Sequence, residues 1–205
     1  CTTRADQIKH GNIKNPYERI CYGVGYIGFG EYKSKVDGVS SREYDMWRNM
    51  IYRCYDSNYK TKTYEDVDVC KLWHNFQNFA EWCHNNEFFN KEEDGEYYQL
   101  DKDILAGSIK IYSPKTCVFV PRKINVFLTN RFNHRGKFPL GVTINKSGNY
   151  RAACNENGES IRLGVYDTPI EAFIVYKNYK ENIAKSMATE YEGVLDFRVR
   201  EFLKN

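Results

Sequence analysis

Residues 138–181 read FPLGVTINKSGNYRAACNENGESIRLGVYDTPIEAFIVYKNYKE, and apolar and polar residues alternate in three short parts of this stretch. Those parts are 140–145, 150–155 and 160–165. Alternation with a period of two is typical of strands that bury one face. The connections at 147–149 and 157–158 contain Asn and Gly, which favour hairpin turns. The stretch therefore predicts a three-stranded antiparallel sheet.

A helix is predicted directly after the third strand. Thr168 is a suitable N-cap, Pro169 follows at the first helical position, and Glu171 completes a form of capping box. Apolar residues then recur at helical spacing: Ala172, Val175, Tyr176, Tyr179 and Ile183. We expect this stripe to pack on one face of the sheet.

The alternation also assigns each strand residue to a face of the predicted sheet. One set should face the helix: Val142, Ile144, Ala152, Cys154, Ile161, Leu163 and Val165. The other set should face outward: Thr143, Asn145, Arg151, Ala153, Asn155, Ser160 and Arg162. The outward set contains no acidic residue. Any solvent-facing sheet surface would look partly like this, but Asn and Arg also read adenine and guanine when a sheet lies in the major groove.

These residues resemble the APETALA-type (ethylene-response-factor-like) DNA-binding domain. The motif positions that carry the resemblance are 141–142, 149–152, 163–168 and 171–172. The resemblance implies contacts with double-stranded DNA at these positions: Thr143, Asn145, Asn155 and Arg162. The alternation of apolar and polar residues, and not the resemblance, adds Arg151 to these expected DNA contacts. The sequence departs from the family pattern because Thr or Asn replaces most of its arginines, and Arg162 stands where Trp is usual.

Positive charge is concentrated around this domain. The chain has a net charge of +3, whereas residues 121–165 carry eight Lys and Arg against two Glu. Such a local excess favours a polyanionic partner, although a solvated surface with chance charge has the same composition. We expect Arg131, Arg135 and Lys137, in a basic linker at 131–137, to contact backbone phosphates.

The N-terminal part of the chain predicts a hairpin and two helices. The Gly-rich residues 22–39 indicate a hairpin that ends at Asp37-Gly38, and they lack the Gly-Lys-Ser/Thr of a phosphate-binding loop. Helical spacing of apolar residues predicts one helix from Ser40 or Ser41 to about 56 and another over 69–84. The two helices should pack together. The acidic residues at 91–96 are predicted to form a surface loop.

Residues 98–129 predict two strands, a turn and a short helix, which make a compact ββα unit. This segment and the helices before it are similar to bacteriophage proteins of the HNH or homing-endonuclease type, which pair such a region with the same C-terminal domain. The resemblance implies phage origin, a place in the cytoplasm of the infected bacterium, and cleavage of DNA with Mg²⁺ or Mn²⁺. It also implies that Asp101 and Asn125 hold the metal, and that Asp101, Lys102 and Asp103 form the catalytic segment.

Lys102 stands where that family has its general base, a histidine. A lysine is ordinarily protonated at neutral pH, so it serves as a base only when strongly desolvated. None of the four histidines falls at this position: His10, His74, His84 and His134. A structural alternative also stays open, in which Asp101 and Asp103 are turn carboxylates that pair with Lys102 or Lys110.

Two functional hypotheses follow. The first is a metal-dependent DNA-nicking or DNA-cleaving enzyme with a substituted base. The second is a catalytically inactive DNA-binding or protein-interaction factor, such as a phage regulator or an inhibitor of a host defence system that binds a host protein.

Composition sets outer bounds on the class of protein. At 205 residues with 41% hydrophobic and 28% charged residues, the chain is long enough for a folded core. It contains no apolar stretch of the roughly 18 residues that a membrane span needs, so we expect no membrane partner. The seven cysteines are widely spaced and lack a C-x-x-C pair, so we expect reduced, small apolar residues rather than a zinc site or a disulfide scaffold.

The predicted fold class is α+β, with a degenerate HNH core followed by a three-stranded sheet on one helix. The predicted parts are an N-terminal hairpin region at 1–39, an HNH-like core with two preceding helices at 40–130, a basic linker at 131–137, an APETALA-type domain at 138–190 and a C-terminal tail at 191–205.

Overall fold

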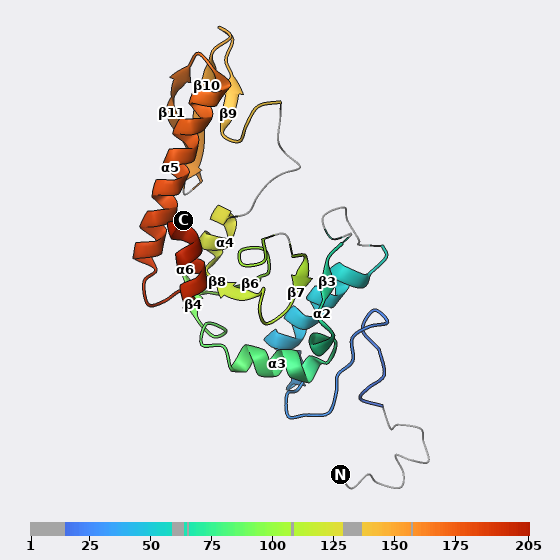
Figure 1. Cartoon of the computed structure of the whole chain (residues 1–205). Coiled ribbons are helices and arrows are strands. Elements are labelled where there is room, and N and C mark those ends of the chain that lie inside the picture. Colours follow the sequence, from blue (N-terminus) through green and yellow to red (C-terminus); the bar gives the residue numbers. More distant parts are fainter. Residues whose placement is uncertain (1–14, 59–63, 65, 108, 129–136, 157) are drawn as a thin grey trace, which may run out of the picture. The chain divides into compact units, whose positions relative to one another are not determined.

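The protein is of the α+β class, with five α-helices and several small sheets in the part that the structure describes (Figure 1). This computed structural model describes residues 15–58, 64, 66–107, 109–128, 137–156 and 158–205. The chain forms two compact units, Cys1–Pro121 and Arg122–Asn205. Within the described ranges, no helix combines the length and the apolar content that crossing a membrane requires.

In its described residues, the first unit contains two α-helices and four pairs of short strands. Its elements are β1 (Lys35–Val36), β2 (Val39–Ser40), α2 (Arg42–Tyr55), β3 (Asp68–Val69), the 3₁₀ helix η1 (Lys71–His74), α3 (Phe76–His84), β4 (Glu92–Glu93), β5 (Glu96–Tyr97), β6 (Gln99–Asp101), β7 (Ile111–Tyr112) and β8 (Val118–Val120). The pairs β1–β2, β4–β5 and β6–β8 are antiparallel, whereas β3 and β7 are parallel.

Helix α2 confirms the first helix predicted from the sequence. The Ser41 side chain caps its N-terminus by accepting a hydrogen bond from the backbone N–H of Tyr44 at 3.4 Å. The helix buries four residues at positions i, i+3, i+4 and i+7: Trp47, Met50, Ile51 and Cys54. Because one face carries all four, the helix lies against the core of the unit.

The prediction of one continuous helix over 69–84 is wrong. The segment is divided into β3, η1 and α3, and Leu72, which the helical pattern placed in the core, is 55% exposed. The Asn75 side chain starts α3 by accepting a hydrogen bond from Gln77 N–H at 3.0 Å. The backbone of Tyr26 bonds on both sides of this position, to the His74 carbonyl and the Phe76 N–H, both at 2.9 Å. A long-range backbone contact therefore interrupts the apolar pattern.

The Gly-rich N-terminal segment is a hairpin only at its end. Asp37 and Gly38 form the tight turn between β1 and β2, with φ of 51° and 83°. Farther upstream, the chain makes turns whose glycines let the backbone lie against α3. A Cβ at Gly30, for example, would lie 2.2 Å from the Gln77 side-chain oxygen. The predicted loop at 91–96 also contains a short hairpin, β4–β5, whose residues are mostly exposed.

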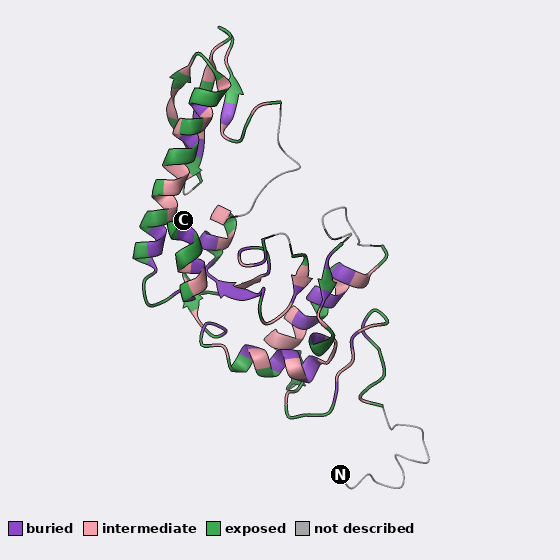
Figure 2. Cartoon of the chain, in the orientation of Figure 1, coloured by how far each residue is buried: buried purple, intermediate pink, exposed green. Residues whose placement is uncertain are grey.

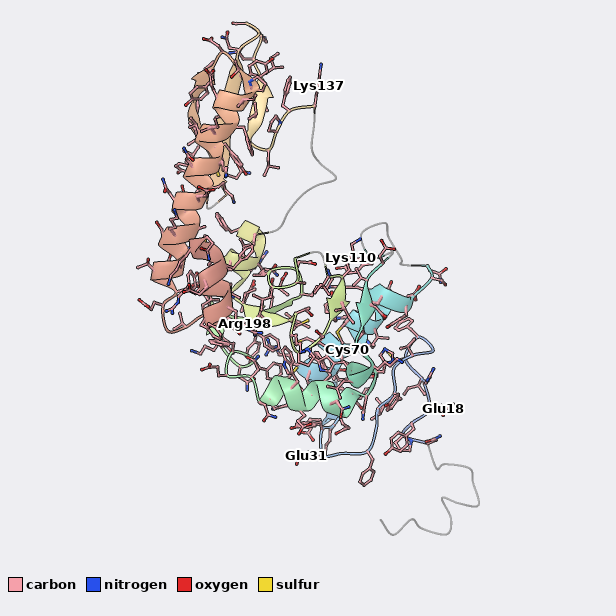
Figure 3. The ribbon with its side chains drawn as sticks, in the orientation of Figure 1. Glu18, Glu31, Cys70, Lys110, Lys137 and Arg198 are labelled. Carbon is pink, nitrogen blue, oxygen red and sulfur yellow. The ribbon has the colours of Figure 1, made fainter. Side chains whose placement is uncertain are left out.

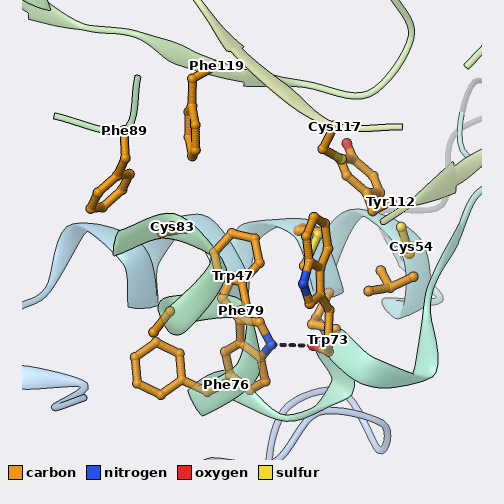
Figure 4. Packing of buried hydrophobic residues seen from close by; sticks show 14 of the residues in the cluster. Trp47, Cys54, Trp73, Phe76, Phe79, Cys83, Phe89, Tyr112, Cys117 and Phe119 are labelled. Carbon is orange, nitrogen blue, oxygen red and sulfur yellow. Dashed lines mark hydrogen bonds between the residues drawn. The ribbon is translucent and has the colours of Figure 1, made fainter. Parts of the chain in front are cut away.

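Aromatic residues form the core of the first unit (Figure 4). The largest fully buried side chains there are Trp47, Trp73, Phe76, Phe79 and Phe119. The indole N–H of Trp47 donates a 2.7 Å hydrogen bond to the Trp73 carbonyl, so its polar atom is satisfied inside the core. Burial of each such side chain contributes on the order of 2 kcal/mol.

Cysteines complete this core as small apolar residues. Cys54, Cys83 and Cys117 are at most 1% exposed and lie in the core drawn in Figure 4. Figure 2 shows the buried parts of α2 and α3 in purple. Burial raises the pKa of the Cys117 thiol to about 12. A thiol in this environment stays protonated at neutral pH and behaves as an apolar group.

The second unit contains the predicted three-stranded sheet and its helix. Its elements are α4 (Arg122–Leu128), β9 (Val142–Ile144), β10 (Tyr150–Glu156), β11 (Glu159–Tyr166), α5 (Pro169–Glu190) and α6 (Phe197–Lys204). The strands are antiparallel in the order β11-β10-β9, as predicted. The capping box at α5 is also confirmed: Thr168 Oγ1 accepts from Glu171 N–H at 3.2 Å, and the Glu171 carboxylate accepts from Thr168 N–H at 3.1 Å.

Helix α6 lies within residues 191–205, where the sequence predicts only a C-terminal tail. Asp196 caps this helix by accepting a 2.9 Å hydrogen bond from Arg198 N–H. Val199 and Leu203 are buried, and α6 packs on α5. The pair Val199 and Leu203 has helical spacing, which is the signal that could have predicted this short helix.

Candidate functional site

The sheet of the second unit has one face against α5 and one face open to solvent. Ala152 on β10 packs with Val142 and with Ala172 of α5, which defines the covered face. Cross-strand partners lie on the same face of a sheet, so the register identifies the opposite, open face. We call it the outer sheet face, and it has three rows: Thr143, Arg151 and Val165; then Ala153 and Arg162; then Asn155 and Ser160.

A β-bulge changes the composition of this face from the one predicted. Ala152 pairs with Gly164 but Ala153 pairs with Arg162, so Leu163 is an extra residue in β11. Gly164 has φ of +142°, a conformation that L side chains rarely adopt. The extra residue reverses the alternation beyond it, and Val165 lies beside Arg151 on the outer sheet face with 40% of its surface exposed.

The prediction that Val165 faces the helix is therefore wrong. Leu163, in contrast, packs against the cluster on the covered face, as predicted. Gly164 is the signal that could have indicated the bulge, because glycine inside a strand often marks one.

Two arginines give the outer sheet face its charge. Arg151 and Arg162 are both exposed, and neither makes an ion pair or a side-chain hydrogen bond with any residue that the structure describes. Other arginines of the same unit are paired: Arg198 with Asp196 at 2.7 Å and Arg200 with Glu192 at 2.8 Å. The outer sheet face therefore presents two cations and, among its seven residues, no carboxylate.

The nearest acidic residue along β10 turns away from this face. Glu156 accepts a 2.6 Å hydrogen bond from the hydroxyl of Tyr179, which belongs to α5. This bond holds the carboxylate on the side of the helix and raises the pKa of the Tyr179 hydroxyl. Glu156 therefore does not neutralise the two arginines by a direct contact.

The remaining predicted DNA contacts fall into three groups. Thr143 and Asn155 are exposed on the outer sheet face. Asn145 lies in the turn after β9, where its side-chain oxygen accepts backbone hydrogen bonds from Ser147 at 2.9 Å and Asn149 at 3.0 Å. That oxygen shapes the turn. Lys137 is exposed ahead of β9 (Figure 3), and Arg131 and Arg135 lie outside the described residues.

The second candidate site, Asp101–Asp103, lies at the end of β6 in the first unit. One carboxylate oxygen of Asp101 accepts hydrogen bonds from the backbone N–H groups of Asp103 at 2.7 Å and Ile104 at 2.9 Å. Burial raises the pKa of this carboxyl, and the two hydrogen bonds partly oppose the rise. Asp101 thus stabilises the turn that follows β6.

Lys102 is held by neighbours of its own. It is 7% exposed, and its ammonium group pairs with the carboxylate of Asp103. The same group lies 5.9 Å from the ring centroid of Tyr64 and 5.6 Å from that of Tyr112. Lys110 pairs instead with Asp66 at 3.2 Å. These contacts match the structural alternative, in which the carboxylates stabilise a turn and pair with a lysine.

The predicted metal ligands are divided between the two compact units. Asp101 belongs to the first, whereas Asn125 lies on α4 in the second. Across the described ranges, no group of three or more His, Cys, Asp or Glu residues is arranged to hold a metal ion. The residues around Asp101 also do not fit a divalent cation, because a buried ammonium group already occupies the adjacent position and Asp103 pairs with it.

Two histidines have packing roles in the first unit. His74 bonds to the Val69 carbonyl at 3.0 Å. His84 stacks on Tyr32, with ring centroids 5.0 Å apart, and lies 3.6 Å from a carboxylate oxygen of Glu43. His10 and His134 lie outside the described residues.

Substitution of Asp101 separates its structural role from a catalytic one. Asn can still accept both backbone hydrogen bonds and carries no charge to bury, so Asp101→Asn should be at least as stable as the wild type at pH 7. Asp101→Ala loses the acceptor and should be about 1 kcal/mol less stable. Urea denaturation of both variants measures the difference. Equal destabilisation of the two would contradict the role of the carboxylate oxygen as an acceptor.

The pH dependence should follow from the raised pKa of Asp101. Because the carboxyl ionises less readily in the folded state than in the unfolded state, its stabilising contribution is fully present below the unfolded pKa and is lost as pH rises through the folded value. Asp101→Asn does not titrate, so its advantage over the wild type should increase with pH across that window. An advantage that shrinks as pH rises would contradict this assignment.

Comparison with known proteins found no relative of this chain. No family model, no curated protein and no solved structure matches the chain.

Proposed function

We propose that this protein binds double-stranded DNA through the outer sheet face of its second unit. The observation that carries the proposal is the pair of exposed arginines, Arg151 and Arg162, which form no ion pair with any described residue and lie on a face whose seven residues include no carboxylate. Unpaired arginines are the side chains best suited to phosphate and to the guanine edge in the major groove.

The dimensions of the sheet also support this mode of binding. Strands lie about 4.8 Å apart, so a row across three strands spans about 10 Å. The major groove is about 12 Å wide and admits β-structure. Arg151 is on the central strand and Arg162 is on the neighbouring edge strand, one row farther along. One arginine can therefore contact a base edge while the other contacts a base or a phosphate.

A titration of the full chain with a fluorescent duplex tests the proposal. We expect a rise in anisotropy that weakens steeply as salt increases, because each neutralised phosphate releases counterions. The negative slope of log K against log salt should correspond to several phosphate contacts. Absence of duplex binding at low salt would overturn the proposal.

We favour a binding protein over the metal-dependent nuclease implied by the HNH resemblance. In favour of the nuclease, β6 pairs with β8 and α4 follows β8 along the chain. The side chains, however, do not fit the chemistry: Lys102 is buried and paired, and Asp101 serves as an acceptor in a turn. A base needs a free electron pair, and a paired ammonium group has none to offer.

A cleavage assay separates these two functions. Supercoiled plasmid is incubated with the wild type and with Asp101→Asn, each with Mg²⁺ and with Mn²⁺. The binding hypothesis predicts intact plasmid in all four reactions and equal retention of DNA by both proteins. Nicking by the wild type that Asp101→Asn abolishes would establish the nuclease instead.

A further inference from the structure

The β-bulge in β11 places an apolar side chain on the proposed DNA surface, on an edge strand beside Arg151 of the central strand. Without the extra residue at Leu163, regular alternation would direct Val165 toward α5. With it, Val165 lies directly across from Arg151 and is 40% exposed. Val165 therefore presents exposed methyl groups beside a charged side chain, and an apolar group of a bound partner can cover them.

The residues beside Val165 indicate which chemical group of the DNA it would contact. In its row, Arg151 is flanked on one side by Val165 and on the other by Thr143, and both flanking residues carry methyl groups. The major groove offers one apolar feature, the C5-methyl group of thymine, and side-chain methyl groups contact it. Guanidinium groups, in turn, recognise guanine there.

We propose that Val165 is a specificity-determining residue that contacts the C5-methyl group of a thymine next to the base pair contacted by Arg151. This inference rests on the proposed function and adds sequence preference to it. The row spans about 10 Å and fits across the groove, so its three side chains can contact the same or adjacent base pairs. The preferred DNA site should therefore contain a thymine adjacent to a guanine.

The test is a double-mutant cycle between protein and DNA. The preferred duplex is first selected from a randomised pool with the full-length wild type. Each thymine in it is then replaced singly by deoxyuridine, which lacks only the methyl group. For one thymine we expect the wild type to lose about four-fold in affinity, the value of one buried methyl group. Val165→Ala should bind this thymine and its deoxyuridine equally.

Ile144→Ala is the matched control. Ile144 is an exposed apolar residue of the same sheet, 51% exposed, but its partner Tyr150 packs on the covered face. This variant should keep the full sensitivity to deoxyuridine. Thermal denaturation of both variants checks that they are folded. If Val165→Ala does not fold, Val165→Thr takes its place, because threonine keeps the β-branched shape and one of the two methyl groups. Val165→Thr should then show a reduced response.

The outcomes distinguish this inference from the proposed function. One outcome is that the chain binds a preferred duplex, but deoxyuridine at every thymine lowers the affinity of Val165→Ala as much as that of the wild type. The role of Val165 is then overturned and DNA binding stands. If the wild type binds no duplex at all, the proposed function fails and this inference fails with it. Loss of the deoxyuridine response in Val165→Ala alone supports the inference.

Discussion

Replacing both Arg151 and Arg162 with alanine is expected to weaken duplex binding at least about 30-fold in 100 mM salt. Each arginine contact with a base edge or phosphate is worth about 1–3 kcal/mol, and every 1.4 kcal/mol is a factor of ten. Neither side chain is paired in the described part of the free protein, so no internal ion pair is lost on substitution. The salt slope should also fall by about one for each arginine that contacts phosphate.

A second double variant controls for net charge. Lys177→Ala with Lys204→Ala removes the same two charges from the same unit, but these lysines pair with Glu181 at 3.6 Å and Glu201 at 2.8 Å on the helices. Exposed pairs of this kind contribute little to stability. We expect less than about a three-fold change in affinity. Equal losses in the two double variants would show that the outer sheet face is not the DNA surface.

Gly141→Ala is expected to be the most destabilising small substitution in the second unit, at about 3 kcal/mol. Gly141 has φ of +75°, and its carbonyl accepts a 2.9 Å hydrogen bond from Ala153 N–H, which ties the start of β9 to β10. An added Cβ would lie 2.0 Å from the buried ring of Tyr176. Backbone strain and overpacking each cost about 1–3 kcal/mol.

Gly148 provides the matched control for the cost of backbone strain. It also has a positive φ, +87°, but a Cβ there would meet no atom within 4 Å. Gly148→Ala should therefore cost about 1 kcal/mol from strain alone. Urea denaturation followed by circular dichroism measures both. Equal costs for the two variants would mean that contact with Tyr176 does not limit residue 141.

Local patterns explain the elements that could be predicted from the sequence. The period of the apolar residues and a capping side chain lie within a few positions of each other in α2 and α5, so both helices and their starts are evident. The three strands alternate and are separated by Asn-Gly-type turns, which also define the antiparallel order. The charge of the outer sheet face follows from the same alternation.

Contacts between distant parts of the chain explain what could not be predicted. The backbone of Tyr26 interrupts the apparent helix at Asn75, and the parallel pairing of β3 with β7 joins segments about 40 residues apart. Neither leaves a periodic signal.

In the candidate site, the bulge at Leu163 reversed the side of Val165, and the turn engaged Asn145 through backbone groups that no side-chain pattern reveals. The sequence indicates the pairing of Lys102 with Asp103 only as an alternative, because a motif alone does not show which atoms are already bonded.

Helix α5 gives the second unit a mechanical property. Its 22 residues extend for about 33 Å. Near its start, the helix packs on the sheet through Ala172 and Tyr176. Near its end, where the chain turns toward α6, Met187 and Ala188 are buried. A continuous helix transmits rotation along its axis, because bending it sharply would break backbone hydrogen bonds. A fluorophore attached to α6 should therefore report the orientation of the sheet, because α5 connects the two.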